Sequence, residues 1–232
     1  MQGCVEQALS EIADSPVRTV CAGRTDAGVH AQGQIIHFET TVTRQSRAWV
    51  YGANTNLPRD ISILWARGVP DGFHARFSAR SRHYRYQILN RAVRPALLRK
   101  RFAWEGRTLS VDRMQAAGDY LLGEHDFSTF RASHCQATSP VRTIHHLRII
   151  RHGDRIYIDV IANAFLQHMV RNIVGVLVAV GLGREEPKWV NRILAMCDRT
   201  QGGVTVPAGG LCLMGIEYPE HFRIPQISGS SD

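Results

Sequence analysis

Residues 21–31 read CAGRTDAGVHA, and this stretch places a single carboxylate, Asp26, between two glycines where an apolar run gives way to a loop. The preceding residues, 17–22, are rich in β-branched side chains and predict a short strand. Residues 32–38 partly alternate and predict a second strand. We therefore expect Asp26 on a strand-to-strand connection, where proteins commonly display reactive groups on rigid supports.

Two interpretations of Asp26 are open at this point. Gly23 and Gly28 allow positive φ and let a ligand approach the backbone closely, which suits a reactive carboxylate. Aspartate also fixes turns by bonding to its own backbone, which would give Asp26 a purely local role. Spacing alone favours the local role.

The charge balance of the chain favours a polyanionic partner. Its 232 residues include 28 basic and 20 acidic side chains, which gives a net charge of +8. Only Lys100 and Lys188 are lysines, and the planar fork of arginine suits phosphates and base stacking. A GC-rich genome, whose codon usage favours arginine over lysine, would produce the same excess of arginine.

The strongest nucleic-acid signal is the stretch between Gly72 and Trp104, which contains no acidic residue. Aromatic residues are interleaved with its cations, the mixture expected where phosphates are tracked and bases are stacked. A solvated basic face would have a similar composition. The cations of this basic segment are Arg76, Arg80, Arg82, Arg85, Arg91, Arg94, Arg99, Lys100 and Arg101.

Several classes of protein are disfavoured by the sequence. The five cysteines form no closely spaced pair and no histidine lies in a His-Glu-x-x-His pattern, so we expect neither a zinc site nor a disulfide scaffold. The longest uncharged apolar stretch, residues 173–183, is far short of the ~20 residues that span a bilayer. Acidic residues precede any long apolar run, which predicts a cytoplasmic protein without a secretory signal.

Alternating strand and helix patterns predict an α/β or α+β chain with a mixed sheet. Val5, Leu9 and Ile12 have the spacing of an amphipathic first helix. Further helices are expected at residues 112–122, 167–180 and 187–195. Strands are expected at residues 35–38, 61–66, 84–89, 147–151, 156–161 and 211–217.

The block of residues 23–31 closely resembles the signature of the tRNA pseudouridine synthase A family. This signature is long and specific, and the resemblance extends over essentially the whole chain. It continues through NTNLP at 54–58 with DI at 60–61, FHARFSA at 73–79, RHYRY at 82–86, HDF at 125–127, ANAF at 162–165 and HMVRNI at 168–173.

The resemblance implies a fold of two pseudosymmetric α/β halves with joined mixed sheets and a basic cleft. The halves would be residues 1–72, with the catalytic loop, and residues 73–232, with the basic segment and an arginine-bearing helix. The implied partners are tRNA and a second copy in a homodimer. The implied reaction isomerises uridine to pseudouridine at positions 38 to 40 of the anticodon stem-loop, without a redox cofactor, a small-molecule cofactor or a catalytic metal.

The resemblance also assigns roles to five residues of this chain. Asp26 is the catalytic carboxylate, and Arg171 is its cationic partner. Tyr84 stacks on or beside the target base and handles a proton, while Leu211 packs on the base. Arg24 meets the RNA. Without the resemblance, Arg171 would be interpreted as a helix-surface arginine and Tyr84 and Leu211 as residues of the sheet and core.

One departure from the family concerns the start of the chain. Family members begin with an additional strand and a segment bearing Tyr-Asp-Gly and Gly-Trp-Gln elements, whereas this chain starts near the following helix. A missing strand would expose an unpaired sheet edge. One alternative is therefore a catalytically silent tRNA-binding or RNA-folding protein in which Asp26 is misaligned. A more distant alternative is a hydrolase that uses Asp26 with a histidine such as His30, although no nucleophile elbow or metal motif supports it.

Overall fold

The computed structural model describes residues 1–225, which group into two compact units. Unit 1 comprises residues 1–24, 35–79 and 218–224. Unit 2 comprises residues 25–34 and 80–217 together with Pro225. Each unit is described by itself below.

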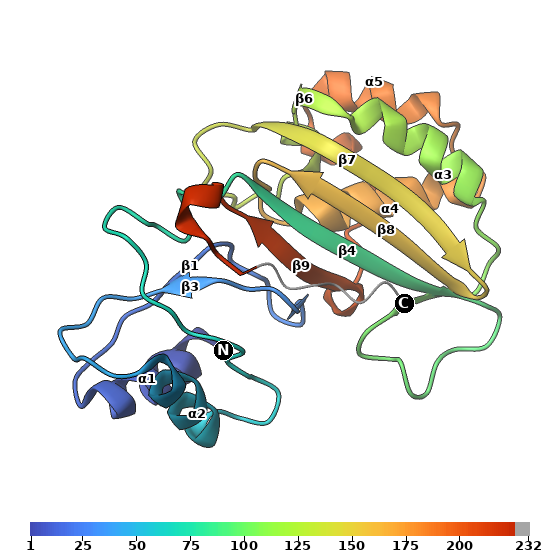
Figure 1. The fold of residues 1–232 in the computed structure, drawn as a ribbon. Helices are drawn as coiled ribbons and strands as arrows, with labels where there is room; N and C mark the ends of the chain where they lie inside the picture. Colours follow the sequence, from blue (N-terminus) through green and yellow to red (C-terminus); the bar gives the residue numbers. More distant parts are fainter. Residues whose placement is uncertain (226–232) are drawn as a thin grey trace. The chain divides into compact units, whose positions relative to one another are not determined.

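Unit 2 is built on a seven-stranded sheet (Figure 1). The strand order is β2-β9-β4-β8-β7-β6, with β5 beside β4. The β2–β9 and β4–β5 pairs are parallel and all other pairs are antiparallel, so the predicted mixed sheet and α/β class are confirmed. The strands are β2 (His30–Ala31), β4 (Ser81–Asn90), β5 (Ala103–Glu105), β6 (Gly123–Asp126), β7 (Val141–His152), β8 (Arg155–Ala162) and β9 (Leu211–Glu217).

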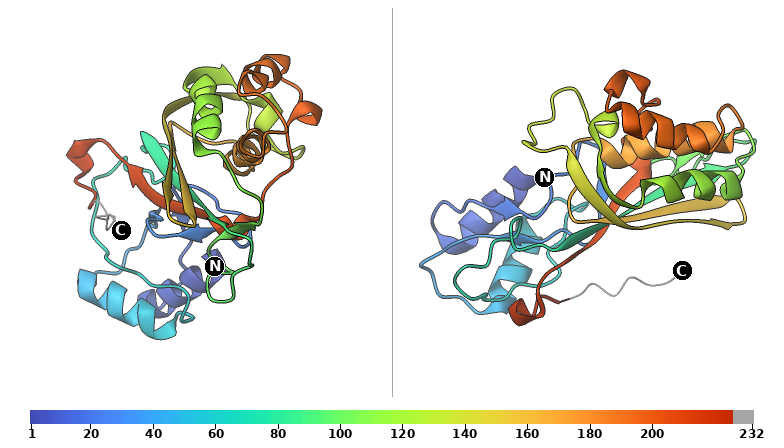
Figure 2. Two further views of the ribbon diagram at one scale, coloured as in Figure 1. Left: turned by 90° about the vertical axis from the view of Figure 1, so that its right-hand side faces the viewer. Right: turned by 90° about the horizontal axis from the view of Figure 1, so that it is seen from above.

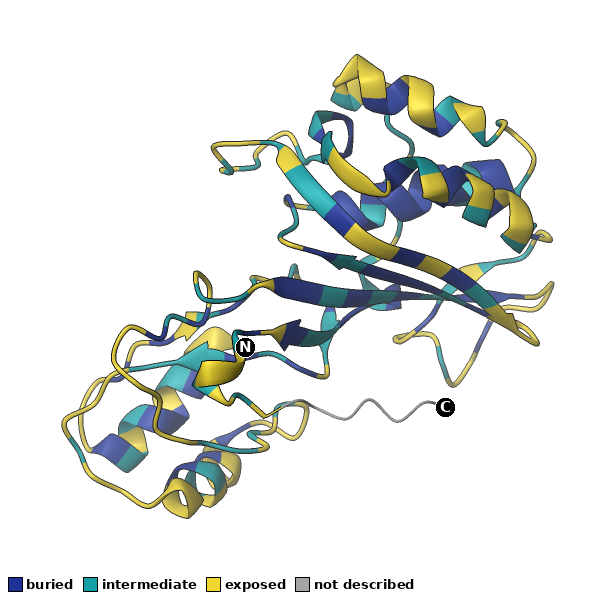
Figure 3. Cartoon of the chain, turned by 45° about the horizontal axis from the view of Figure 1, so that its top comes forward, coloured by how far each residue is buried: buried dark blue, intermediate teal, exposed yellow. Residues whose placement is uncertain are grey.

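Three helices lie on one face of this sheet, as Figures 1 and 2 show: α3 (Val111–Gly118), α4 (Met169–Gly181) and α5 (Lys188–Met196). Helix α4 is apolar on almost every side, which is typical of a helix enclosed in a core. Alternate residues of the central strands, such as Tyr86 and Ile158, are fully buried. Buried residues accordingly concentrate in α4 and the central strands (Figure 3).

Unit 1 packs two helices together with a small antiparallel sheet. The helices are α1 (Gln2–Ala13) and α2 (Ser46–Asn56), and the strands are β1 (Val20–Cys21) and β3 (Ile36–His37). The predicted apolar face of α1 is confirmed, because its members lie in the unit's core or against it. The buried residues of this core are Val5, Ala8, Leu9, Ala13, Val17, Trp49, Ala53 and Leu57.

The units do not follow the predicted halves, residues 1–72 and 73–232. Residues 25–34 group with unit 2, because β2 pairs with β9. Residues 73–79 group with unit 1, where the Ala75 amide donates to His37 Nδ1 at 3.1 Å. The pseudosymmetry of two halves and the missing first strand stay predictions.

Most predicted elements are present with shifted ends, but the strand at residues 61–66 is wrong. Both backbone groups of Ile63 bond to the side chain of Asn54, at 2.7 and 2.8 Å, so they are not available to a sheet ladder. Helix α2 and strands β2, β5 and β6 were not predicted, because each is short and lacks a clear apolar period. Short 3₁₀ turns complete the fold at Asp119–Leu121, Ser128–Phe130, Arg199–Gln201, Ala208–Gly210 and Glu220–Phe222.

No helix within residues 1–225 is both long enough and apolar enough to cross a bilayer.

Candidate active site

The loop between β1 and β2 presents Asp26 on a tight turn, as the sequence predicts. The Val29 amide donates to the backbone carbonyl of Asp26 at 3.0 Å and closes the turn. Gly28 has φ of 83°, the positive value that a type II turn requires at its third position. Because the backbone carbonyl closes the turn, the Asp26 carboxylate is not needed for this local role.

The carboxylate instead forms an ion pair with Arg171 on α4. Arg171 Nη1 lies 3.2 Å from Asp26 Oδ2, and the two side chains are 15% and 31% exposed. The Arg171 Nε also donates to the Val206 carbonyl at 2.8 Å, which fixes the plane of the guanidinium. Arg171 lies in the first turn of α4, where the helix dipole adds to the attraction for a carboxylate.

A second basic side chain, His168, reaches the same carboxylate. Its Nε2 lies 3.2 Å from Asp26 Oδ2, and the pair is ionic when the imidazole is protonated. His168 is the N-cap residue of α4, three positions before Arg171, so the two side chains leave the helix on the same side.

The carbonyl that orients Arg171 belongs to a segment held tightly against α4. A Cβ on Gly175 would collide with the Val204 carbonyl oxygen, so this approach requires glycine. Asn172, which is fully buried, accepts from Thr205 Oγ1 at 2.6 Å and donates to the Phe130 carbonyl at 2.7 Å. These contacts position the backbone that supports the Arg171 side chain.

Tyr84 and Leu211 lie on one face of the unit 2 sheet. Tyr84 is 7% exposed and meets Phe165 edge-on, with ring centroids 5.1 Å apart. Leu211 starts β9 directly opposite Tyr86 and is 6% exposed. Tyr86 itself donates to the Pro207 carbonyl at 2.8 Å; burial raises its pKa, which nearby Arg171 opposes, so it is a neutral donor. Tyr86 and Arg171 thus hold adjacent carbonyls of one segment.

Two other residues of the sequence analysis have different surroundings. Arg24 is exposed, and it precedes Asp26 by two positions in the chain. His30 hydrogen-bonds through Nε2 to the Lys100 carbonyl at 2.7 Å. The imidazole beside Asp26 is therefore that of His168 and not that of His30.

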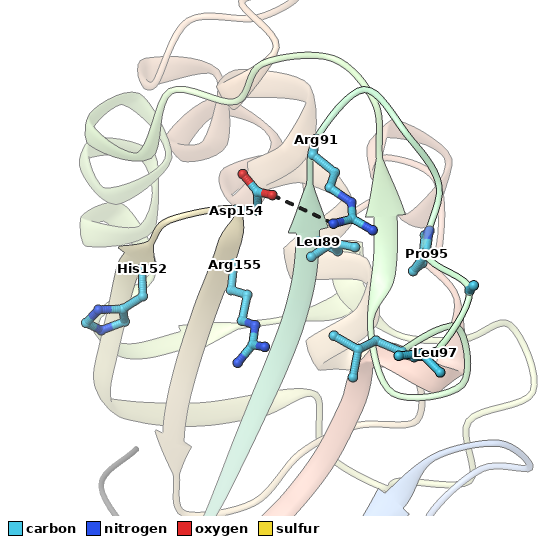
Figure 4. A pocket seen from close by; sticks show the side chains of 9 residues that line it. Leu89, Arg91, Pro95, Leu97, His152, Asp154 and Arg155 are labelled. Atoms are coloured by element: carbon cyan, nitrogen blue, oxygen red, sulfur yellow. Dashed lines mark ion pairs between the residues drawn. The ribbon is translucent and has the colours of Figure 1, made fainter.

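No cluster of metal-ligating side chains is found in the described part of the chain. A hollow of about 450 Å³ lies between the end of β4 and the β7–β8 turn (Figure 4). It is lined by Leu97, His152 and Arg155, among others, and its Arg91 and Asp154 form a weak ion pair at 3.9 Å. None of the predicted site residues lines it, so it is separate from the Asp26 site.

Comparison with known proteins identifies the family. A family model for tRNA pseudouridine synthase matches residues 117–219. The tRNA pseudouridine synthase A of Coxiella burnetii (strain Dugway 5J108-111) is 54% identical over 227 residues, which cover 98% of this chain and 87% of that protein. This chain belongs to the tRNA pseudouridine synthase A family. The resemblance stated from the motifs is thereby confirmed.

Two further members of the tRNA pseudouridine synthase A family align as fully. The protein of Nitrosococcus oceani is 53% identical over 228 residues, 98% of this chain and 88% of that protein. The protein of Vibrio cholerae (strain ATCC 39541) is 53% identical over 227 residues, 98% of this chain and 86% of that protein. These alignments include the Asp26 loop, which the match at residues 117–219 does not reach.

Sequence analysis missed two contributors to this candidate site. His168 belongs to the HMVRNI motif, and its spacing of three from Arg171 was the available signal. The Val206 carbonyl left no signal, because a backbone acceptor is defined only by the folded chain.

Proposed function

We propose that this chain converts uridine to pseudouridine at positions 38 to 40 of the tRNA anticodon stem-loop, with the Asp26 carboxylate as the reacting group. The observation that supports this most directly is the ion pair between Asp26 and Arg171 at 3.2 Å, since it joins the two ends of the family's motif pattern. Arg171 orients the carboxylate through this contact.

The isomerisation of uridine requires a reactive group of this kind. The bond from the base nitrogen to the sugar breaks, the uracil turns, and its C5 forms the new bond to the sugar while the C5 proton leaves. Substrate and product contain the same atoms and electrons, so the reaction needs no oxidant or reductant. An ionised carboxylate can attack the sugar or the base, or remove a sugar proton. Arg171 holds the carboxylate in position in each case.

A uridine stacked in a stem must leave its duplex before it meets Asp26, at a cost of a few kcal/mol. We propose that the exposed Arg24 and the basic segment offset this cost through contacts with the RNA. Tyr84 and Leu211, which share one sheet face, would form the apolar floor on which the base packs. These roles follow the family pattern residue by residue.

The experiment is a tritium-release assay with purified protein on tRNA labelled at uridine C5. Formation of the new C5 bond releases the label to water, and we expect release in proportion to pseudouridine found in the digested RNA. Variants of this tRNA with each of the three uridines replaced by cytidine assign the positions used. Tight binding of tRNA without release would contradict the proposal and identify a silent binding protein. That alternative is not favoured, because it required a misaligned Asp26, whereas Asp26 and Arg171 are paired.

We further propose that the protein acts as a homodimer in the cytoplasm, as the family resemblance implies. Light scattering of the chain, whose mass is 26.0 kDa, should then give twice this value.

Fractionation of cells should recover the protein with the cytoplasmic tRNA-modifying activity. A monomer that is fully active in the tritium assay would contradict the dimer.

A further inference from the structure

We propose that His168 is a positioning residue: together with Arg171 it anchors Oδ2 of Asp26, so that Oδ1 is the oxygen presented to the substrate. This inference rests on the proposed function of Asp26. It assigns a role to a histidine that the sequence analysis left unused.

The distances place both basic side chains nearest the same carboxylate oxygen. His168 Nε2 and Arg171 Nη1 each lie 3.2 Å from Oδ2, which is the nearer carboxylate oxygen for both. Within residues 1–225, no hydrogen bond to Oδ1 of Asp26 is found. A carboxylate held at one oxygen from two directions cannot turn about its Cβ–Cγ bond without losing both contacts, so its oxygens have distinct roles.

The backbone at His168 is shaped for this contact. His168 has φ of 62° and ψ of 0°, a left-handed conformation that a residue other than glycine adopts at an energetic cost. Histidine is among the residue types enriched there, and such outliers persist where the surroundings require them. This conformation directs the imidazole from the N-terminus of α4 toward the Asp26 turn, while Arg171 approaches from the first turn of the helix.

The charged surroundings of the imidazole come from two elements. Asp26 faces it from the loop between β1 and β2, and Arg171 faces the shared carboxylate from α4. His168 and Arg171 therefore repel one another when both are charged, and the carboxylate between them offsets this repulsion. Removing the imidazole should leave Asp26 held by Arg171 alone, so that the carboxylate rotates more easily.

Three substitutions separate the side chain from the backbone. His168→Gln retains a donor near the place of Nε2, whereas His168→Asn tolerates the left-handed backbone but is too short to reach Asp26. His168→Gly removes the backbone cost and the side chain together. Cys197→Gly is the matched control, since Cys197 has φ of 50° at the end of α5, outside the site.

The first readout is the single-turnover rate on C5-tritiated tRNA, measured beside the tRNA dissociation constant. We expect His168→Asn and His168→Gly to lower the rate about 10- to 100-fold without a matching loss of affinity, because a misplaced catalytic group loses rate rather than binding. His168→Gln should recover most of the rate, and Cys197→Gly should leave it unchanged. If His168 had only a structural role, His168→Gly would instead raise the stability, by removing the cost of the left-handed backbone, and would leave the rate unchanged.

The second readout needs no turnover, so it separates failure of this inference from failure of the proposed function. The protein is labelled with ¹⁵N-histidine, and the His168 resonance is assigned by its loss in His168→Gln. We expect Asp26→Asn to move this resonance and to leave those of the other ten among the 11 histidines nearly unchanged.

The outcomes are distinct. A His168 resonance that ignores Asp26→Asn, or a His168→Asn enzyme with full rate, would overturn the positioning role. If the wild-type protein binds tRNA but releases no tritium while the resonance does move, the geometry stands and the proposed function fails.

Discussion

At the scale of single residues, the surroundings of a carboxylate decide its role. Asp159 is 7% exposed, and both its oxygens are used: His83 Nε2 lies 2.6 Å away, and Arg85 donates through Nε and Nη2 at 2.9 and 3.1 Å. Asp26 is more exposed, and its two basic partners, His168 and Arg171, lie nearest the same oxygen. Asp159 is therefore a structural carboxylate, whereas Oδ1 of Asp26 has no hydrogen-bond partner within the described residues.

This contrast predicts how stability depends on Asp159. Burial raises the pKa of Asp159, but the hydrogen bonds from His83 and Arg85 outweigh burial, and the net pKa is lowered. A lowered pKa in the folded state contributes stability above the unfolded value of about 3.9, and this contribution is lost as the pH falls through the folded value. Asp159→Asn should therefore lower the free energy of unfolding by about 3 kcal/mol at neutral pH.

Urea unfolding at a series of pH values tests this prediction. The difference between the wild-type protein and Asp159→Asn should shrink as the solution is acidified. The control is Asp154→Asn, since Asp154 is 58% exposed and its contact with Arg91 is 3.9 Å; a change within about 0.5 kcal/mol is expected there. A difference at Asp159 that stays constant down to low pH would contradict the assigned ion pairs.

The candidate site shows how much of its geometry the sequence alone can predict. Spacing favoured a local turn for Asp26, and only the family motifs singled out its partner Arg171. The two residues are 145 positions apart, so no local pattern can report their contact. His168 was overlooked for the same reason, although its motif was recognised.

At the scale of elements, helix α4 and the segment that follows α5 form one supporting structure for Arg171. The segment approaches so closely at Gly175 that a side chain there would collide with the Val204 carbonyl. Two residues further along, Val206 accepts from Arg171. The orientation of the Asp26–Arg171 pair therefore depends on a contact between backbones.

Gly175→Ala tests this dependence. We expect the added methyl group to lower the free energy of unfolding by about 1–3 kcal/mol, because it must push the Val204 segment away from α4. Turnover at a temperature where the variant is still folded should fall as well, since the Val206 carbonyl moves from Arg171. Chemical unfolding and single-turnover rates measure the two effects.

The matched control is Gly3→Ala in α1, where a Cβ would meet nothing within 4 Å. There we expect a gain of up to about 1 kcal/mol from helix propensity. Equal stability of Gly175→Ala and the wild-type protein would mean that the close approach does not constrain the site.

Prediction of elements succeeded where a long apolar period was present. Residues 211–217 match β9, and the apolar run at 167–180 matches α4 within two residues. It failed at 61–66, where alternation is present but the Asn54 side chain bonds both backbone groups of Ile63. A side chain from a neighbouring helix replaced the strand partner, which no periodicity can anticipate.

At the scale of the whole molecule, the excess of arginine predicts binding that depends on salt. Arg99 and Arg101 are exposed in the loop between β4 and β5, at the C-terminal end of the basic segment. If they bind phosphates, replacing both with glutamine should weaken tRNA binding. The slope of log K against log salt should also fall, by about 0.7–0.9 for each phosphate that is no longer neutralised.

The control changes the same charge elsewhere in unit 2. Lys188 and Arg192 are exposed on α5, and their double replacement with glutamine should leave the slope nearly unchanged. Filter binding at several salt concentrations gives both slopes. Equal decreases in the two double variants would mean that net charge, rather than the basic segment, attracts the RNA.

The central claim is that the Asp26 carboxylate performs the reaction, and a single-turnover experiment with Asp26→Asn tests it most directly. Asparagine keeps the size of the side chain but removes the charge, so tRNA should still bind with nearly the wild-type dissociation constant. We expect tritium release to fall by more than about 1,000-fold. A variant that still releases tritium at a rate near that of the wild-type protein would contradict the account.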